Sequence, residues 1–288
     1  MNFLALGGSL FVPATHKDLL CIISGEKYKN LKSVVIDIED SIASKDLQKA
    51  LKNLYDALEN FKKNDLFVFI RPRNSSMLQE LLLKKNIQNI DGFILPKLGI
   101  DNFEKYFSLL EEKEYFIMPS IEGKELFHLS DLQILRDKLL SFKEKIPIVR
   151  FGLEDMFRQV RMRRDSDKSV FDYAISNAVL GNFLALFKSV GFEVSGGVYP
   201  YFQDNEGFKK DLQRDLKEGL FSKTIIHPSQ IDLCNEVYKV SQREYDKAKK
   251  ILSLQDGIGK HNDQMLEATT MSPYAKIIVS RAKIYGIY

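Results

Sequence analysis

The sequence predicts a single (β/α)8 barrel followed by a C-terminal helical extension. Its 288 residues fit an α/β barrel that fills nearly the whole chain. Hydrophobic residues make up 44% and charged residues 28%, so a large core is feasible. Short β-branched and aromatic runs also alternate with segments of helical periodicity. Eight such units, joined by right-handed crossovers, close naturally into a barrel.

The expected strands are apolar runs that end at a polar, proline or glycine signal. They span residues 9–12, 33–38, 66–70, 92–95, 115–121, 147–151, 192–198 and 224–226. Helical spacing predicts helices between them, over residues 46–61, 75–85, 128–142, 170–190 and 206–217. An open doubly wound sheet is the alternative. It is disfavoured because no G-x-G-x-x-G follows the first strand, and the pair Gly7 and Gly8 precedes that strand.

The segment after the eighth run predicts two helices over residues 229–254. In the second, residues 242–254, a polar face of Arg243, Asp246, Lys247 and Lys250 opposes an apolar face of Tyr245, Ala248 and Leu252. Residues 255–270 are polar, and a final helix is expected over 273–284. We therefore assign a barrel domain to residues 1–254 and an extension to residues 255–288. The extension is a lid, an oligomer arm or a solvated tail.

The charge and cysteine content of the chain indicate which binding partners and which cellular compartment to expect. Lys plus Arg number 42 against 39 for Asp plus Glu, a formal charge of +3 that favours neither nucleic acid nor membrane as a partner. Cys21 and Cys234 fit no disulfide framework or zinc spacing. No export signal or membrane-spanning stretch is recognisable. We expect a cytoplasmic protein.

Charged residues cluster where the predicted strands end, which in a barrel is the face that carries the active site. Such residues also mark where a chain simply reaches water, but so many on one rim favour a site. They are Asp37, Glu39, Asp40, Arg71, Arg73, Lys97, Glu122, Glu154, Asp155 and His227.

Two of these carboxylates suggest a metal site. Glu122 and Asp155 follow neighbouring strands, and Mg2+ accepts two carboxylates with waters completing its shell. Arg71 offers a two-pronged donor for a substrate carboxylate. A purely structural ion-pair network among these three residues remains the alternative. Lys97 either pairs with a neighbouring carboxylate or binds a substrate oxygen, whereas His227 before Pro228 is interpreted as structural.

Short motifs distributed along most of the chain resemble one family of aldolases. They are SLFVPA at residues 9–14, VVIDIEDSIASKDLQKA at 34–50, FIRPRN at 69–74, DGFILPKL at 91–98, SIEG at 120–123, FGLED at 151–155, DNEGF at 204–208 and KTIIHPSQI at 223–231. Their order and spacing resemble the citrate lyase β-subunit-like branch of the HpcH/HpaI aldolase family, which includes malyl-CoA and citryl-CoA lyases.

The resemblance implies a TIM barrel that binds Mg2+, or Mn2+, through Glu122 and Asp155. It implies that Arg71 is catalytic and holds the 2-oxo acid carboxylate. The acidic motif supplies groups that orient metal-bound waters, namely Asp37, Glu39 and Asp40. Further substrate-binding residues are expected at Arg73, Lys97, Gly152 and Glu154.

Three departures from the family pattern imply a specialised substrate. Gly7 stands where the family commonly has Arg, which removes one anion contact. The usual RVN motif reads Arg71, Pro72, Arg73. The family's G-K-M-[IV]-D segment reads Asp263, Gln264, Met265, Leu266, Glu267. Glu267 is thus the candidate acid/base, which the resemblance implies is donated to a neighbouring subunit of a homo-oligomer.

Two functions from different classes follow. The first is a Mg2+-dependent carbon-carbon lyase or aldolase that cleaves or forms a 3-hydroxy acid or its CoA thioester and yields a 2-oxo acid. The second is a catalytically altered barrel that serves as a binding or scaffold subunit of a larger complex. The retention of Arg71, Glu122 and Asp155 together favours the lyase.

Overall fold

The computed structural model describes residues 1–254, 257–261 and 264–288, without the side chain of His261. The chain divides into two compact units, Met1–Ile231 and Asp232–Tyr288, called here the barrel unit and the C-terminal unit. The division precedes the boundary after residue 254 that the sequence suggested. The reason is that α10 (Gln242–Ser253) packs along α11 (Ala268–Tyr285) and therefore belongs with the extension.

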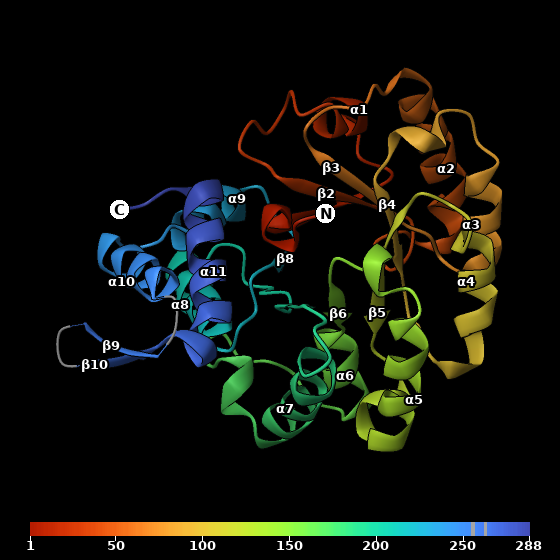
Figure 1. The fold of residues 1–288 in the computed structure, drawn as a ribbon. Coiled ribbons are helices and arrows are strands. Elements are labelled where there is room, and N and C mark those ends of the chain that lie inside the picture. The colour runs from red at the N-terminus through yellow and green to blue at the C-terminus, as the bar shows by residue number, and fades with distance from the viewer. Residues whose placement is uncertain (255–256, 262–263) are drawn as a thin grey trace. The chain divides into compact units, whose positions relative to one another are not determined.

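Eight parallel strands form the barrel, which confirms the predicted fold (Figure 1). They are β1 (Gly8–Pro13), β2 (Ser33–Asp37), β3 (Phe67–Arg71), β4 (Gly92–Leu95), β5 (Phe116–Ile121), β6 (Val149–Phe151), β7 (Val194–Ser195) and β8 (Lys223–Ile225). Each strand pairs with its neighbour in chain order, and β1 also pairs with β8. A single bridge between Gly196 and Lys223 links the ends of β7 and β8 and so closes the ring.

Helices connect the strands and lie outside them, as Figure 1 shows for α2 to α5 beside β3, β4 and β5. The helices are α1 (Leu19–Ile23), α2 (Leu47–Asn60), α3 (Ser75–Leu82), α4 (Phe103–Leu110), α5 (Leu129–Leu140), α6 (Leu153–Gln159), α7 (Ala174–Lys188) and α8 (Asn205–Lys217). After β8, α9 (Ser229–Val237) begins in the barrel unit and continues into the C-terminal unit. The sequence analysis missed α1, α4 and α6. α1 and α6, with five and seven residues, are too short for a clear helical period. Length does not explain α4, which has eight residues like the expected α3.

The barrel interior is built in layers because every second residue of a strand faces inward. An apolar layer contains Leu6, Val35, Phe69, Ile94, Met118 and Ile148. Two residues further along four of these strands, the side chains become polar: Asp37, Arg71, Ser120 and Arg150. The strands therefore carry the core at one level and a polar layer at the next.

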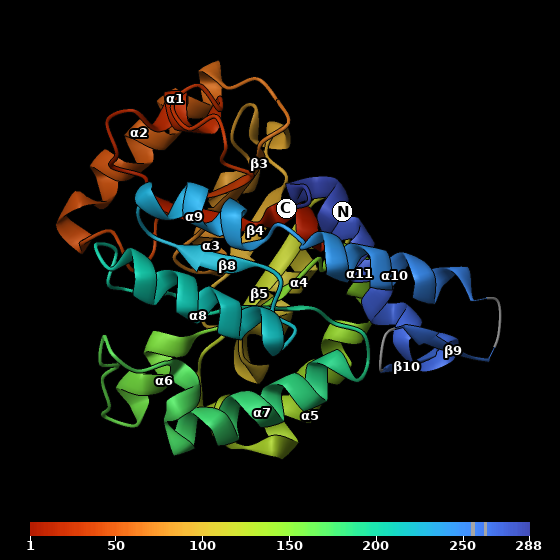
Figure 2. The same ribbon diagram turned by 90° about the vertical axis from the view of Figure 1, so that its left-hand side faces the viewer.

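A buried ion network fixes β8 to α8, which lie side by side in Figure 2. Lys223 on β8 is 1% exposed, and its Nζ lies 2.7 Å from Asp211 Oδ2 and 2.6 Å from Asp215 Oδ2. Arg164 also pairs with Asp211. Burial raises the pKa of Asp215 to about 7 despite the Lys223 charge. Asp215 therefore depends on Lys223 alone, whereas Asp211 is shared between Lys223 and Arg164.

The C-terminal unit contains more structure than the sequence suggested. Within residues 255–270, expected to be a polar stretch, β9 (Ile258–His261) and β10 (Gln264–Glu267) pair antiparallel. Leu266 is fully buried in a cluster with residues of α10 and α11, which explains why this segment is ordered as a strand. Asp263 lies outside the described residues. No described helix is long and apolar enough to cross a membrane.

Two details of the predicted C-terminal helices were wrong. The last helix, α11, begins at Ala268 rather than residue 273, so Pro273 lies inside it at the cost of one backbone hydrogen bond. On α10, Ala248 and Ile251 are buried, and Tyr245 packs against their cluster. Leu252, placed on the apolar face, is instead exposed. The true apolar face is thus rotated toward Ile251.

We predict that Lys223→Met lowers the free energy of unfolding by about 3–5 kcal/mol, because it leaves the buried Asp215 without its cation and Asp211 with Arg164 alone. Urea unfolding of the barrel would measure the loss. Lys124→Met is the control, since the Lys124–Asp101 pair is exposed and its loss should not move the midpoint. Equal effects of the two substitutions would contradict a stabilising role for the buried network.

Candidate active site

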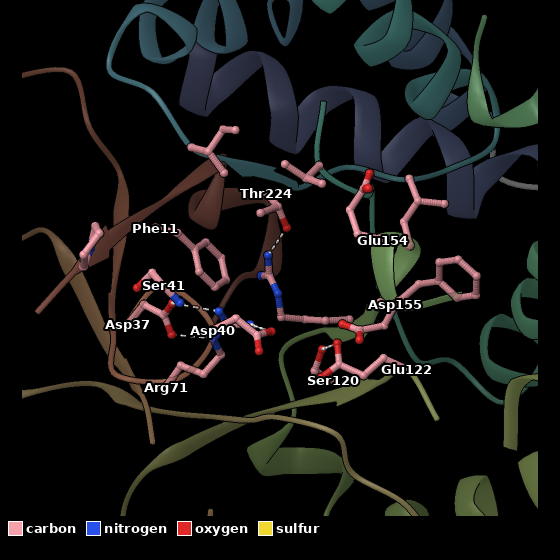
Figure 3. A pocket seen from close by; sticks show the side chains of 17 residues that line it. Phe11, Asp37, Asp40, Ser41, Arg71, Ser120, Glu122, Glu154, Asp155 and Thr224 are labelled. Atoms are coloured by element: carbon pink, nitrogen blue, oxygen red, sulfur yellow. Dashed lines mark hydrogen bonds and ion pairs between the residues drawn. The ribbon is translucent and has the colours of Figure 1, made fainter. Parts of the chain in front are cut away.

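A cavity of about 430 Å³ opens at the carboxyl ends of the barrel strands (Figure 3). The polar layer forms part of its wall, together with residues that follow β2, β5, β6 and β8. Its charged and hydroxyl-bearing lining residues are Asp37, Asp40, Ser41, Arg71, Ser120, Glu122, Arg150, Glu154, Asp155 and Thr224. Phe11 contributes an aromatic ring from β1. The cavity therefore lies where a barrel enzyme carries its active site.

Glu122 and Asp155 lie on the same side of this cavity, as Figure 3 shows. Glu122 follows β5 and is 5% exposed; its Oε1 accepts the backbone N–H of Lys97 at 2.7 Å, and its Oε2 accepts the Ser120 hydroxyl at 3.1 Å. Asp155, in the first turn of α6, accepts Arg158 at 2.7 Å. Burial and the nearby Asp155 charge together raise the pKa of Glu122.

Backbone geometry keeps room for the Glu122 carboxylate. A Cβ on Gly152 would overlap both Cβ and Oε2 of Glu122, so only glycine fits at the end of β6. Lys97 has φ of 48°, a left-handed conformation that residues with a side chain rarely adopt, and its N–H donates to Glu122. Gly152 thus has a steric role here, and its contact with substrate stays a prediction.

The donor set fits a hard divalent cation. Among the described residues, no group of three or more His, Cys, Asp or Glu side chains forms a closed metal cage. Mg2+ needs none, because it is typically bound by one or two carboxylates and keeps several waters. The charge of Asp155 disfavours the ionised form of Glu122 in this buried position, and a divalent cation held by the two carboxylates would offset that effect.

Arg71 lines the cavity but is already paired. Its Nε and Nη2 donate to the two oxygens of Asp37 at 2.6 and 2.8 Å, and its Nη1 lies 3.3 Å from Glu39. Its guanidinium also lies over the Phe11 ring, 5.1 Å from the centroid. Both prongs of the expected carboxylate clamp are therefore occupied by Asp37.

Asp37 is held by a dense set of donors. Burial alone would raise the pKa of Asp37, but bonds from Arg71, its charge, and bonds from Ser41 and Glu39 hold that pKa below 3.8. Asp37 is 1% exposed. Its charge is therefore available to fix Arg71 at neutral pH.

The other strand-two carboxylates belong to a second group with Lys97. The Lys97 ammonium pairs with Glu39 and lies 2.9 Å from Asp40. Burial, followed by the interaction with the neighbouring Asp40 carboxyl, raises the pKa of Glu39 to about 7. Asp40 lines the cavity, whereas Glu39 and Lys97 do not. Lys97 thus forms the ion pair that the sequence left open as one of its two roles.

The remaining predicted site residues are scattered. Glu154 lines the cavity. Arg73 does not line it and instead donates to the Ile38 and Ile42 carbonyls. Glu267 joins β10 to α11 in the C-terminal unit, where the Thr270 hydroxyl donates to it at 3.1 Å. His227 stacks on Phe202 at 4.6 Å and bonds the Ser229 hydroxyl.

Sequence reasoning missed Arg150 and Thr224, which both line the cavity. Arg150 is the middle residue of β6, and its Nη2 donates to the Thr224 hydroxyl on β8. One signal could have revealed it: a lone cation inside the apolar run of residues 146–151. Such a charge is rarely buried unless it is paired or functional.

We predict that Asp37→Asn lowers the free energy of unfolding by about 3 kcal/mol at pH 7, because Arg71 loses its buried partner. The pair's contribution is present above 3.8, the usual pKa of aspartate, and is lost as pH falls through the lower folded pKa. The difference between wild type and variant should therefore begin to shrink below about pH 4 and continue to shrink as the pH falls through the lower folded pKa. Urea midpoints across this range test it, with Asp101→Asn at an exposed site as control. A pH-independent difference would contradict the assignment.

Comparison with known proteins is consistent with the barrel fold. The chain is 23% identical to citrate lyase subunit beta of Escherichia coli K12, covering 96% of this chain and 93% of that protein. It is 21% identical to a (3S)-malyl-CoA thioesterase of Cereibacter sphaeroides KD131, covering 88% and 84%. A crystal structure of CitE from Mycobacterium tuberculosis with magnesium, acetoacetate and coenzyme A matches with a TM-score of 0.70 at 18% identity, covering 96% and 98%.

The match to a whole-chain family model decides the classification. A model described as a C-C bond lyase of the TIM-barrel fold matches residues 1–287. This range contains both units and every residue of the cavity. The protein therefore belongs to the C-C bond lyase family of TIM-barrel proteins.

Proposed function

We propose that this lyase is Mg2+-dependent and cleaves or forms the carbon-carbon bond of a 3-hydroxy acid or its CoA thioester, with a 2-oxo acid as one product. The observation that carries the proposal is the buried Glu122, held beside Asp155 at the cavity wall. Mn2+ would serve the same ligands. The magnesium and acetoacetate bound by CitE from Mycobacterium tuberculosis support the assignment.

In the cleavage direction the substrate hydroxyl loses its proton, the adjacent carbon-carbon bond breaks, and its electrons form an enolate that is then protonated. A bound divalent cation would supply Lewis-acid stabilisation of the developing oxyanion. Glu122 and Asp155 would hold it, and the Ser120 hydroxyl and Lys97 N–H keep the Glu122 carboxylate oriented. Asp37 and Asp40 would orient waters in the cavity, with Glu39 behind them.

The substrate contacts of Arg71, Lys97, Arg73, Gly152 and Glu154 remain proposals of unequal strength. Arg71 is favoured because its guanidinium faces the cavity beside Phe11. Its fork already binds Asp37, so a substrate carboxylate would share it. Gly152 and Glu154 line the cavity. Arg73 and Lys97 do not line it, so they would contact only a substrate that extends beyond the cavity. The proposal includes both a free acid and a CoA thioester as substrate.

Glu122→Gln should weaken Mg2+ binding at least about tenfold, roughly 1.4 kcal/mol, because a neutral amide replaces one of two anionic ligands. Isothermal titration calorimetry measures this directly. Glu125→Gln is the matched control: Glu125 is also buried, but it bonds Ile100 N outside the cavity, so Mg2+ affinity should be unchanged.

The Mg2+ affinity measured in this titration should also depend on pH. Because the pKa of Glu122 is raised, protons compete for this ligand, and Mg2+ affinity should fall as the pH is lowered. Unchanged affinity in Glu122→Gln would exclude the metal assignment.

The reaction itself is tested with the purified chain and small acids. Cleavage of a 3-hydroxy acid or its thioester should require Mg2+, stop with EDTA and recover when the metal is restored. Arg71→Lys keeps the charge but loses the fork, so it probes the proposed clamp. A metal-loaded chain that binds small acids without any turnover would instead favour the scaffold function.

Glu267 is proposed as the acid/base, donated across a homo-oligomer. Because α11 packs against α10, removing the tail would expose the core of the C-terminal unit. A point substitution is therefore the cleaner test. Glu267→Gln should lower kcat about 100-fold or more without changing the unfolding midpoint. Full kcat in this variant would exclude Glu267 as the acid/base.

A further inference from the structure

Arg150 is a buried cation inside the barrel that has no anionic partner in the described part of the chain. Arg150 is 3% exposed, and it lines the cavity from the middle of β6. Its Nη2 donates to the Thr224 hydroxyl, and its Nη1 lies 4.0 Å from the Met118 sulfur. Both acceptors are neutral. A guanidinium has five N–H donors in a rigid fork, so most of its capacity is unused.

Other buried cations of the barrel unit are compensated. Lys223 has Asp211 and Asp215, Arg164 has Asp211, and Arg71 has Asp37. The fold therefore satisfies buried positive charge elsewhere with a carboxylate at bonding distance. An isolated buried charge is strongly unfavourable, and residues that break such a rule are characteristic of functional sites.

The surroundings of Arg150 are those of an anion site. Its guanidinium lies 5.2 Å from the centroid of the Phe11 ring, which Arg71 also faces. Burial and the charge of Arg71 lower the pKa of Arg150 to about 10, although the charge of Glu122 acts in the opposite direction. Arg150 is therefore still a cation at neutral pH. Two guanidinium groups beside one ring repel each other, and an anion bound at Arg150 would relieve that repulsion.

Charge balance indicates which cation is available to a ligand. Asp37 occupies both prongs of Arg71, and a divalent cation would balance Glu122 and Asp155. Of the two cations that line the cavity in the described part of the chain, Arg150 is then the one without a carboxylate at ion-pair distance. The fork of an arginine matches a carboxylate in two-pronged geometry.

We propose that Arg150 binds a carboxylate of the substrate in this cavity. The enzyme therefore accepts only small acids that retain a free carboxylate for this site. Thr224 orients the guanidinium by accepting one of its N–H groups. The proposal rests on the lyase function only for the statement that this acid is the substrate. The carboxylate site itself stands on the geometry of Arg150.

The test is calorimetric titration of the full-length, Mg2+-loaded protein with pyruvate, the smallest 2-oxo acid. Pyruvamide, in which a neutral amide replaces the carboxylate, is the matched ligand control. Arg150→Gln should weaken pyruvate binding at least tenfold, and Arg150→Lys, which keeps the charge without the fork, should weaken it less. Wild-type protein should bind pyruvamide at least tenfold more weakly than pyruvate, and neither substitution should change pyruvamide or Mg2+ affinity.

Thermal unfolding separates this role from a structural one. Because the charge of Arg150 is uncompensated without ligand, Arg150→Gln should unfold at the same temperature as wild type or at a higher one. Pyruvate should raise the unfolding temperature of wild type more than that of the variant. A lower unfolding temperature with unchanged pyruvate affinity, absence of pyruvate binding by wild type, or equal binding of pyruvamide would each overturn the proposal.

The two proposals fail in distinguishable ways. Arg150-dependent pyruvate binding in a protein that cleaves no 3-hydroxy acid would reject the lyase function and keep the carboxylate site. Metal-dependent cleavage with pyruvate affinity and KM unaffected in Arg150→Gln would keep the lyase and reject the site.

Discussion

Compensation of buried charge is the constraint on which the rest of this barrel depends. The strands supply an apolar layer, and two residues later they place charged groups in a cavity partly shielded from water. In such a place each charge needs an opposite charge, a set of hydrogen bonds or a ligand. Asp37 and Arg71 satisfy each other, whereas Glu122 and Asp155 repel, and Arg150 lacks an anionic partner among the described residues.

This distribution of charge separates supporting groups from reactive ones. Residues fixed by their neighbours, such as Asp37 with four protein donors, shape the cavity and cannot respond freely to a ligand. Residues left uncompensated gain most when a ligand arrives. A cation at Glu122 and Asp155 and a carboxylate at Arg150 would each complete a charge pair, so the cavity favours an acid bound together with a metal.

The sequence predicted the barrel and much of its cavity because strand ends carry a readable signal: an apolar run followed by charge. Asp37, Arg71, Glu122 and Asp155 were found this way, and all line the cavity. The same signal also selected Arg73 and Lys97, which do not line the cavity, since a rim residue can turn its side chain away. Arg150 was missed because it lies inside a strand, where inward direction depends on register. Leu266 was missed because its burial depends on packing against α10 and the later turns of α11, which the local sequence pattern does not show.

The central claim is that this cavity binds a divalent cation through Glu122 and Asp155 together with a small acid. A crystal structure of the protein soaked with Mn2+ and pyruvate tests it most directly, because anomalous scattering locates the metal independently of any side chain. The account predicts an anomalous peak within bonding distance of Glu122 and Asp155, with the pyruvate carboxylate on Arg150. A metal held by other residues, or pyruvate bound outside the cavity, would contradict it.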